Sequence, residues 1–213
     1  MTQPILIMGA TSGIGKCAVE EALSRDLPVR AFARSADTLS AAPNLEIASG
    51  DARNASDVAA ALQGVRAVIY ALGIKERLSM LWQEETLFSE TTRILLDQMG
   101  KADVSRLIAV TGFGAGRSRD AMSTLERIGH TAILGRPYAD KSRQETLIMQ
   151  SEADWTIVRP TILTNNKKTG QYRVLRSKSE WRMGMISRCD VAAYLIDAAT
   201  DDIDVKTDVV LTR

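Results

Sequence analysis

Three glycines interrupt an apolar run near the beginning of the chain. The segment ILIMGATSGIGK places Gly9, Gly13 and Gly15 directly after four apolar residues, in a G-x-x-x-G-x-G spacing. Glycines at the end of a strand either form a turn, since glycine adopts positive φ at low cost, or let a phosphate approach the backbone. The neighbouring hydroxyl groups of Thr11 and Ser12 can donate hydrogen bonds to phosphate oxygens. The segment alone leaves both interpretations open.

The rest of the chain predicts strands that alternate with helices. Short apolar runs are separated by longer stretches in which apolar residues recur every three or four positions, the period of an amphipathic helix. The predicted strands and then helices cover residues 5–8, 29–33, 45–48, 67–72, 106–111 and 155–159, and residues 16–25, 56–63, 84–101 and 141–151. Strands that are apolar on both faces belong in a parallel sheet with helices on both sides. We therefore predict an α/β fold: a Rossmann-type, doubly wound parallel β-sheet in a single domain over residues 1–213, less regular from about residue 160.

This fold gives the glycines a function. They lie where the first strand leads into the first helix, and there backbone N–H groups and the positive end of the helix dipole meet the pyrophosphate of a dinucleotide. In that position Gly9 permits the tight turn, Gly13 lets the backbone approach the phosphates and Gly15 lets the helix pack near the sheet. The predicted phosphate-binding residues are Gly9, Thr11, Ser12, Gly13, Ile14 and Gly15.

The end of the second strand indicates which dinucleotide binds. An NAD site usually has Asp or Glu there to hold the ribose hydroxyls, whereas the 2′-phosphate of NADP needs a cation. Here the strand ends AFARS, with Arg34 and Ser35 and no acidic residue. A guanidinium beside a hydroxyl suits a phosphate, so NADP is the predicted cofactor. The alternative is that Arg34 is an ordinary solvated arginine.

Composition excludes several other functions. The chain has 213 residues, of which 45% are hydrophobic and 25% charged, and this suits one globular domain. The formal net charge is +1 and no block of five like charges occurs, which argues against nucleic-acid binding and a membrane-surface patch. The first residues lack the basic flank and length of a signal peptide, so we expect a cytoplasmic protein. Cys17, Cys189 and the single His130 do not suit a disulfide framework or a metal site.

Several segments together resemble a known family, the atypical short-chain dehydrogenase/reductase superfamily in its NmrA-like, biliverdin-reductase-B-like (flavin reductase) branch. The resemblance covers nearly the whole chain and rests on GATSGIG, VRAFARS, GDARN, YALG, EADWTIVRPTIL and KTGQYRV, in that order. It implies an NAD(P)H-binding domain in which further residues surround the cofactor. These are Asp51 and Ala52 near the adenine, Ala71, Leu72 and Gly73 along the dinucleotide, and Pro160 and Thr161 beside the nicotinamide.

The catalytic residues of that superfamily are only partly present. Its better-known members use a serine after the fifth strand and a Tyr-x-x-x-Lys pair, in which the lysine lowers the pKa of the tyrosine that donates a proton. Here Gly112 falls on the serine position with Thr111 beside it, and Tyr138 and Lys141 are three residues apart rather than four. Tyr138 is either a proton donor or a helix residue that packs under a loop. The resemblance implies that Lys141 reaches the nicotinamide ribose, and the alternative is an exposed helix lysine. Thr111, Tyr138 and Lys141 are the candidate catalytic residues.

A reductase without a tyrosine acid needs a substrate that accepts hydride readily and takes its proton from water. Flavins and linear tetrapyrroles do so because their conjugated rings spread the delivered charge. We therefore predict an NADPH-dependent reductase of a small conjugated acceptor, with substrate-side elements mainly from residues 112–137 and 160–188. Candidate contacts are Arg117 and Arg119 for an anionic group, Tyr172 and Trp181 for ring stacking, and Met183 and Met185 for the ring edge. Alternatively, these residues only close a hairpin or cover the sheet.

A second interpretation is a non-catalytic, NmrA-like NADP(H)-binding redox sensor that acts through a protein partner. The missing serine and the shifted Tyr138 favour the sensor, whereas Lys141 favours the reductase. A sugar-nucleotide epimerase fits less well, because the region after residue 160 is short for a nucleotide-sugar domain. Both a monomer and a dimer are compatible with the sequence.

Overall fold

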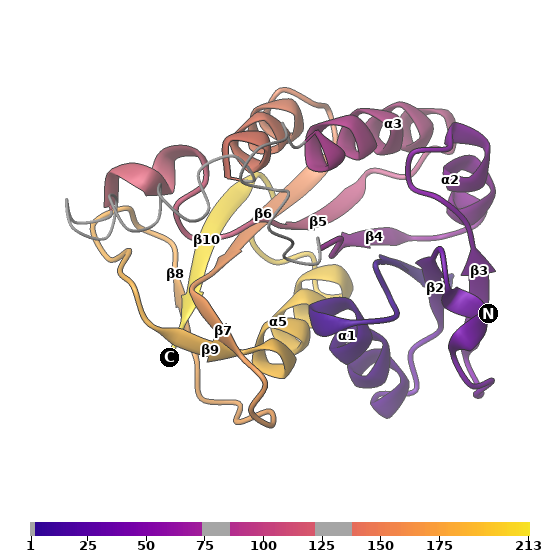
Figure 1. The fold of residues 1–213 in the computed structure, drawn as a ribbon, viewed down its shortest axis with the longest axis horizontal. Coiled ribbons are helices and arrows are strands. Elements are labelled where there is room, and N and C mark those ends of the chain that lie inside the picture. The colour runs from indigo at the N-terminus through magenta and orange to yellow at the C-terminus, as the bar shows by residue number, and fades with distance from the viewer. Residues whose placement is uncertain (1–2, 74–85, 122–137) are drawn as a thin grey trace.

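The computed structural model of the protein describes residues 3–73, 86–121 and 138–213. These residues form a central sheet of eight strands in the order β3-β2-β1-β4-β5-β6-β10-β8, with a separate pair, β7 and β9 (Figure 1). Seven strands of the central sheet are parallel, and β8 runs antiparallel to β10. The predicted doubly wound parallel sheet is confirmed.

The elements follow one another as strands and helices in alternation over most of the chain. The strands are β1 (Ile5–Met8), β2 (Val29–Ala33), β3 (Leu45–Ser49), β4 (Ala67–Tyr70), β5 (Arg106–Val110), β6 (Asp154–Pro160), β7 (Ile162–Thr164), β8 (Arg173–Leu175), β9 (Met185–Ser187) and β10 (Thr207–Thr212). The helices are α1 (Gly13–Ser24), α2 (Ala55–Leu62), α3 (Leu87–Lys101), α5 (Arg188–Thr200) and a further helix over residues 138–149, with short 3-10 turns at η1 (Ala36–Thr38) and η3 (Gly116–Ala121).

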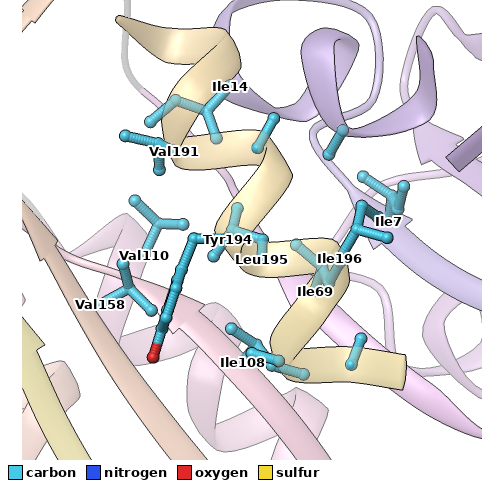
Figure 2. Packing of buried hydrophobic residues seen from close by; sticks show 14 of the residues in the cluster. Ile7, Ile14, Ile69, Ile108, Val110, Val158, Val191, Tyr194, Leu195 and Ile196 are labelled. Carbon is cyan, nitrogen blue, oxygen red and sulfur yellow. The ribbon is translucent and has the colours of Figure 1, made fainter. Parts of the chain in front are cut away.

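Helices cover both faces of the sheet, because alternate residues of its buried strands point to opposite sides. In β1, Ile5 and Ile7 pack with α1 and α5, whereas Leu6 and Met8 pack with α2, α3 and the 138–149 helix. Figure 1 shows the two layers, and Figure 2 shows α5 at the centre of the first one. There Tyr194 and Leu195 lie among apolar side chains from four central strands.

The C-terminal part is more regular than the sequence analysis predicted. After residue 160 the chain forms α5 and then β10, which pairs with β6 inside the sheet. The prediction was wrong because α5 lacks an amphipathic period: nine of its thirteen residues are buried. A helix that is apolar on most sides gives no helical pattern in the sequence.

The parallel topology brings the ends of separate strands to one edge of the sheet. The carboxyl ends of β2, β1, β4, β5 and β6 are neighbours in that order, so the residues that follow them lie along the same edge. Gly9, Arg34, Ala71, Thr111 and Thr161 are therefore brought together by the fold, as expected for ligand sites in sheets of this kind. None of the helices formed by the described residues is long and apolar enough to traverse a lipid bilayer.

Candidate functional site

The glycine loop between β1 and α1 is tightly packed at two positions and open at the third. A Cβ atom on Gly9 (φ +84°) would lie 2.6 Å from the carbonyl oxygen of Ala71, and one on Gly15 would lie 2.2 Å from the carbonyl oxygen of Gly9. At Gly13 (φ +56°) the nearest atom to such a Cβ is Nε of Arg188, 3.9 Å away. Gly9 and Gly15 therefore hold the loop together, whereas Gly13 faces open space.

The N-terminus of α1 is arranged to accept an anion. The side chain of Ser12, the N-cap residue, makes no capping hydrogen bond, and the first turn carries no acidic residue. No side chain in the described part of the chain therefore competes for the first N–H groups, whose partial positive charge attracts a phosphate. Together with the open space at Gly13, this fits the pyrophosphate of a dinucleotide.

The end of β2 lies beside this loop, where Arg34 and Ser35 are predicted to meet the 2′-phosphate. The hydroxyl of Ser35 is 3.5 Å from the hydroxyl of Thr11 and donates a hydrogen bond to it. Arg34 is exposed, and its side chain forms no ion pair or hydrogen bond with the described residues. Arg34 is thus a solvated arginine in this structure, available to an anionic ligand beside the loop.

The residues expected around the adenine and along the dinucleotide occupy the neighbouring strand ends. Ala71 donates its N–H to the carbonyl oxygen of Met8, and its own carbonyl backs onto Gly9. Leu72 is partly buried and Gly73 is exposed. On the other side of the loop, after β3, Asp51 is exposed while Ala52 packs into the core under α2 and α3. Pro160 ends β6, and the Thr161 hydroxyl donates to the carbonyl oxygen of Leu211 (3.2 Å).

Lys141, Thr111 and Tyr138 meet at the end of β5. Nζ of Lys141 donates a hydrogen bond to the carbonyl oxygen of Thr111 (2.5 Å) and lies 4.7 Å from the centroid of the Phe88 ring. It also lies 5.9 Å from the centroid of the Tyr138 ring, because the three-residue spacing puts both side chains on one helix face. Lys141 is partly buried, so the exposed-lysine alternative is wrong.

Gly112 and Tyr138 fit each other closely. A Cβ atom on Gly112 would lie 2.6 Å from the Tyr138 hydroxyl oxygen, so the ring occupies the space that a serine side chain would need. Burial raises the pKa of Tyr138 to about 12, which makes its hydroxyl a weaker acid than an ordinary tyrosine. Burial also lowers the pKa of Lys141 to about 8, against the charge of Glu145 that raises it. Lys141 still carries its proton in most of the population at neutral pH, but burial is the cause that sets the pKa of Tyr138, so the tyrosine stays a weak acid.

Behind these residues lies a buried chain of charges that the sequence analysis missed. Glu145 accepts hydrogen bonds from the Thr111 hydroxyl (2.7 Å) and from Nε and Nη2 of Arg159 (2.9 and 2.8 Å). Arg159, which is 0% exposed, also pairs with Asp208, and Asp208 accepts from Nε of Arg117 (2.8 Å). The single arginine in the apolar strand DWTIVRP was the available signal, since a buried charge requires a partner.

The hydrogen bonds of Thr111 indicate a structural role rather than the catalytic one that the sequence predicts. Its hydroxyl proton is engaged with Glu145 and its carbonyl with Lys141, so Thr111 links the helix to the end of β5. Burial alone would raise the pKa of Asp208, but the hydrogen bonds and charges of Arg117 and Arg159 hold it below its ordinary value. Asp208 is therefore ionised at neutral pH, between the guanidinium groups of Arg117 and Arg159.

The residues proposed to contact an acceptor separate into two groups. Trp181 is 5% exposed, donates its ring N–H to the Leu175 carbonyl and is covered by the guanidinium groups of Arg117 and Arg159, so it covers the sheet. Tyr172 packs against the cluster that includes α1 and α5, near the charges of Asp197 and Arg25. Met185, by contrast, is 61% exposed, and it pairs across β7 and β9 with Ile162, which is 54% exposed.

Some predicted residues fall outside the described part of the chain. His130 and the segment 122–137 lie there, and the side chain of Arg119 is likewise not described. Within the described residues, Cys17 and Cys189 are free thiols that contact each other between α1 and α5. No cluster of His, Cys, Asp and Glu suited to a metal ion occurs among the residues that the structure describes.

A family model described as NAD(P)H-binding matches residues 9–202 of the chain. An uncharacterized chloroplastic protein of Arabidopsis thaliana is 27% identical over 205 residues, which cover 92% of this chain and 72% of that protein. Among solved structures, ChuY of Escherichia coli O157:H7, described as an anaerobillin reductase, is 27% identical, with a TM-score of 0.80 over 98% of this chain and 96% of its own.

A further solved structure supports the fold alone. It is a short-chain dehydrogenase/reductase of Veillonella parvula in complex with NADP, 16% identical, with a TM-score of 0.83 over 100% of this chain and 95% of that one. The agreement of three comparisons over nearly the whole chain extends the likeness beyond the glycine loop to the complete domain.

Proposed function

This chain belongs to the NAD(P)H-binding family, and from that premise we propose that it is a reductase that transfers hydride from NADPH to a conjugated acceptor such as a flavin or a linear tetrapyrrole. The dinucleotide supplies the hydride when it is bound. The chain supplies the binding groups: the N-terminus of α1 for the pyrophosphate, Arg34 with Ser35 for the 2′-phosphate, and Lys141 for the nicotinamide ribose.

The weak acidity of Tyr138 is the observation that favours a conjugated acceptor over a ketone or an aldehyde. A ketone or aldehyde needs a proton at the moment of hydride transfer, and a tyrosine whose pKa burial raises to about 12 is a poor donor. Gly112 offers no hydroxyl to share this task. A conjugated ring spreads the negative charge and takes its proton from water, so the chain needs only to hold the ring in position.

The surface near the end of β6 supports a flat, apolar acceptor. Ile162 follows Pro160 and Thr161 directly, and its exposed side chain lies opposite that of Met185 on β9. Exposed apolar pairs of this kind suit the edge of a large ring, and methionine adapts to irregular shapes. The name of the 27% identical ChuY, an anaerobillin reductase, agrees with a tetrapyrrole as the acceptor.

Steady-state oxidation of NADPH tests the proposal, with FMN or biliverdin as the acceptor under anaerobic conditions. We expect Tyr138→Phe to lower kcat by less than about tenfold, since a dedicated acid contributes roughly 10² to 10⁴. Lys141→Ala should cost more, because it removes the side chain that we assign to the ribose. Tyr172→Phe and Lys101→Ala are matched controls, a tyrosine whose pKa burial also raises to about 12 and an exposed helix lysine. A large loss at Tyr138 with little at Lys141 would identify the tyrosine as the acid.

The redox sensor is the second candidate, and Gly112 in place of a serine is the observation that favours it. Tight binding of NADPH by the parent protein without turnover of any acceptor would favour the sensor over the reductase.

The proposal includes a cytosolic location, supported by the two free thiols of Cys17 and Cys189.

A further inference from the structure

The side chain of Arg188 reaches the glycine loop from the opposite end of the chain. Ser187 ends β9 and caps α5, since its hydroxyl oxygen accepts the N–H of Asp190 at 2.9 Å. This cap fixes where α5 begins and places Arg188 at its first position. From there, Nε of Arg188 is the atom nearest to the open side of Gly13, 3.9 Å from the position of an added Cβ.

The guanidinium of Arg188 is held in place without being neutralised. Its Nη1 donates to the amide oxygen of Asn165 (2.7 Å), which is uncharged. No carboxylate in the described residues forms an ion pair with it: the adjacent Asp190 is engaged by the N–H groups of Thr169 and Gly170, each at 2.8 Å. This side chain therefore keeps its full positive charge and leaves Nε and Nη2 for another partner.

Arg25 also lies between α1 and α5, and its contacts are those of an arginine with a structural role. Arg25, at the end of α1, is paired with Glu21 and with Asp197 of α5, at 2.6 Å in each case. Those pairs join the two helices through opposite charges. Among the residues that the structure describes, Arg188 has no such carboxylate, and the loop that it approaches carries the partial positive charge of the α1 N-terminus. Two positive groups side by side repel each other unless an anion lies between them.

We propose that Arg188 binds the pyrophosphate of the dinucleotide, closing the anion site that the glycine loop begins. The planar fork of the guanidinium suits a phosphate, and the hydrogen bond to Asn165 fixes its orientation before the ligand arrives. This assigns Arg188 and Arg34 to different phosphates: Arg188 to the pyrophosphate shared by NADH and NADPH, and Arg34 to the 2′-phosphate of NADPH alone. The inference depends on dinucleotide binding and not on the identity of the acceptor.

Equilibrium binding separates the two assignments, with NADPH, NADH and 2′-AMP as ligands in fluorescence or calorimetric titrations. Arg188→Ala should weaken NADPH and NADH by the same factor, roughly ten- to a hundredfold for a charge-assisted contact, and leave 2′-AMP unchanged. Arg34→Ala should do the reverse: it should weaken NADPH and 2′-AMP by a similar factor and leave NADH unchanged. Arg188→Lys should recover part of the loss, since it restores the charge without the fork.

The matched control is Arg25→Ala, which removes an arginine between α1 and α5 that does not reach the loop. We expect it to leave all three affinities unchanged and to lower the melting temperature. Unaltered binding of NADPH and NADH by Arg188→Ala would overturn the proposal. So would an equal loss of 2′-AMP, because that result would mean that the substitution acts through the fold rather than on the pyrophosphate.

Discussion

The carboxyl edge of the sheet holds charge in two different ways. At the glycine loop, Arg34 and Arg188 have no carboxylate partner among the described residues, and the N-terminus of α1 adds further positive charge. At the ends of β5 and β6, Glu145, Arg159 and Asp208 are buried and paired with one another. The first region is open to a ligand, whereas the second satisfies its charges internally.

This contrast indicates that the glycine loop binds the ligand and that the buried charges stabilise the fold around it. An unpaired cation near solvent adds little to folding and is free to recognise an anion. A buried ion pair contributes little net stability as a pair, but it becomes costly when one partner is removed. We therefore expect substitutions in the glycine loop to change affinity with a smaller effect on stability, and substitutions in the buried charges to do the opposite.

The largest effect should follow Arg159→Met. It leaves the carboxylates of Glu145 and Asp208 buried without their shared partner, which should lower the free energy of unfolding by about 3 to 5 kcal/mol. Urea denaturation followed by circular dichroism measures this. The control is Arg53→Met, whose side chain is 47% exposed and pairs with Glu90, itself 44% exposed, and its cost should stay below about 1 kcal/mol. Equal costs for the two variants would mean that the buried charges are not the support that the contrast requires.

Gly13→Val tests the opposite region. A branched side chain would fill the open space in front of the α1 N-terminus, so affinity for NADPH should fall at least about a hundredfold, or about 2.7 kcal/mol. Positive φ at this position adds strain of about 1 to 2 kcal/mol to the fold. Gly64→Val is the matched control: Gly64 has a similar φ of +67° and open space, but it lies in the turn before β4. Gly64→Val should lose about as much stability as Gly13→Val and keep its affinity for NADPH. If both variants lost affinity equally, the loss would come from strain in the fold and not from the phosphate site.

The same contrast explains how much the sequence could predict. The loop from Gly9 to Gly15 is contiguous, so its spacing carries the information, and Arg34 follows a strand that the periodicity identifies. Arg159 and Asp208 are 49 residues apart and lie on strands that only the sheet makes neighbours. Arg188 reaches the loop from a helix whose buried faces concealed its period, so no local pattern connects it to Gly13. Residues that act across elements require the topology before they can be paired.

The smallest effect concerns Lys141, which belongs to both regions. Its Nζ is anchored on Thr111 and, in our proposal, points to the ligand, while burial lowers its pKa to about 8. As pH rises through about 8 the ammonium loses its proton, so we expect affinity for NADPH to fall about three- to tenfold between pH 7 and 9. Lys141→Arg should abolish this decrease, because a guanidinium keeps its charge over that range.

Stability should respond to the same proton in the opposite direction. The unfolded chain holds the Lys141 proton up to a pKa of about 10.4, whereas the folded chain releases it at about 8. Between these values the unfolded state binds more protons, so the contribution of Lys141 to the free energy of unfolding rises with pH. Titrations of NADPH and urea denaturation of the parent and of Lys141→Arg, both from pH 7 to 10, measure the two trends. If the affinity of the parent for NADPH did not change with pH, Lys141 would not contact the ligand through its charge. If the alkaline decrease persisted in Lys141→Arg, another group would be the one that titrates.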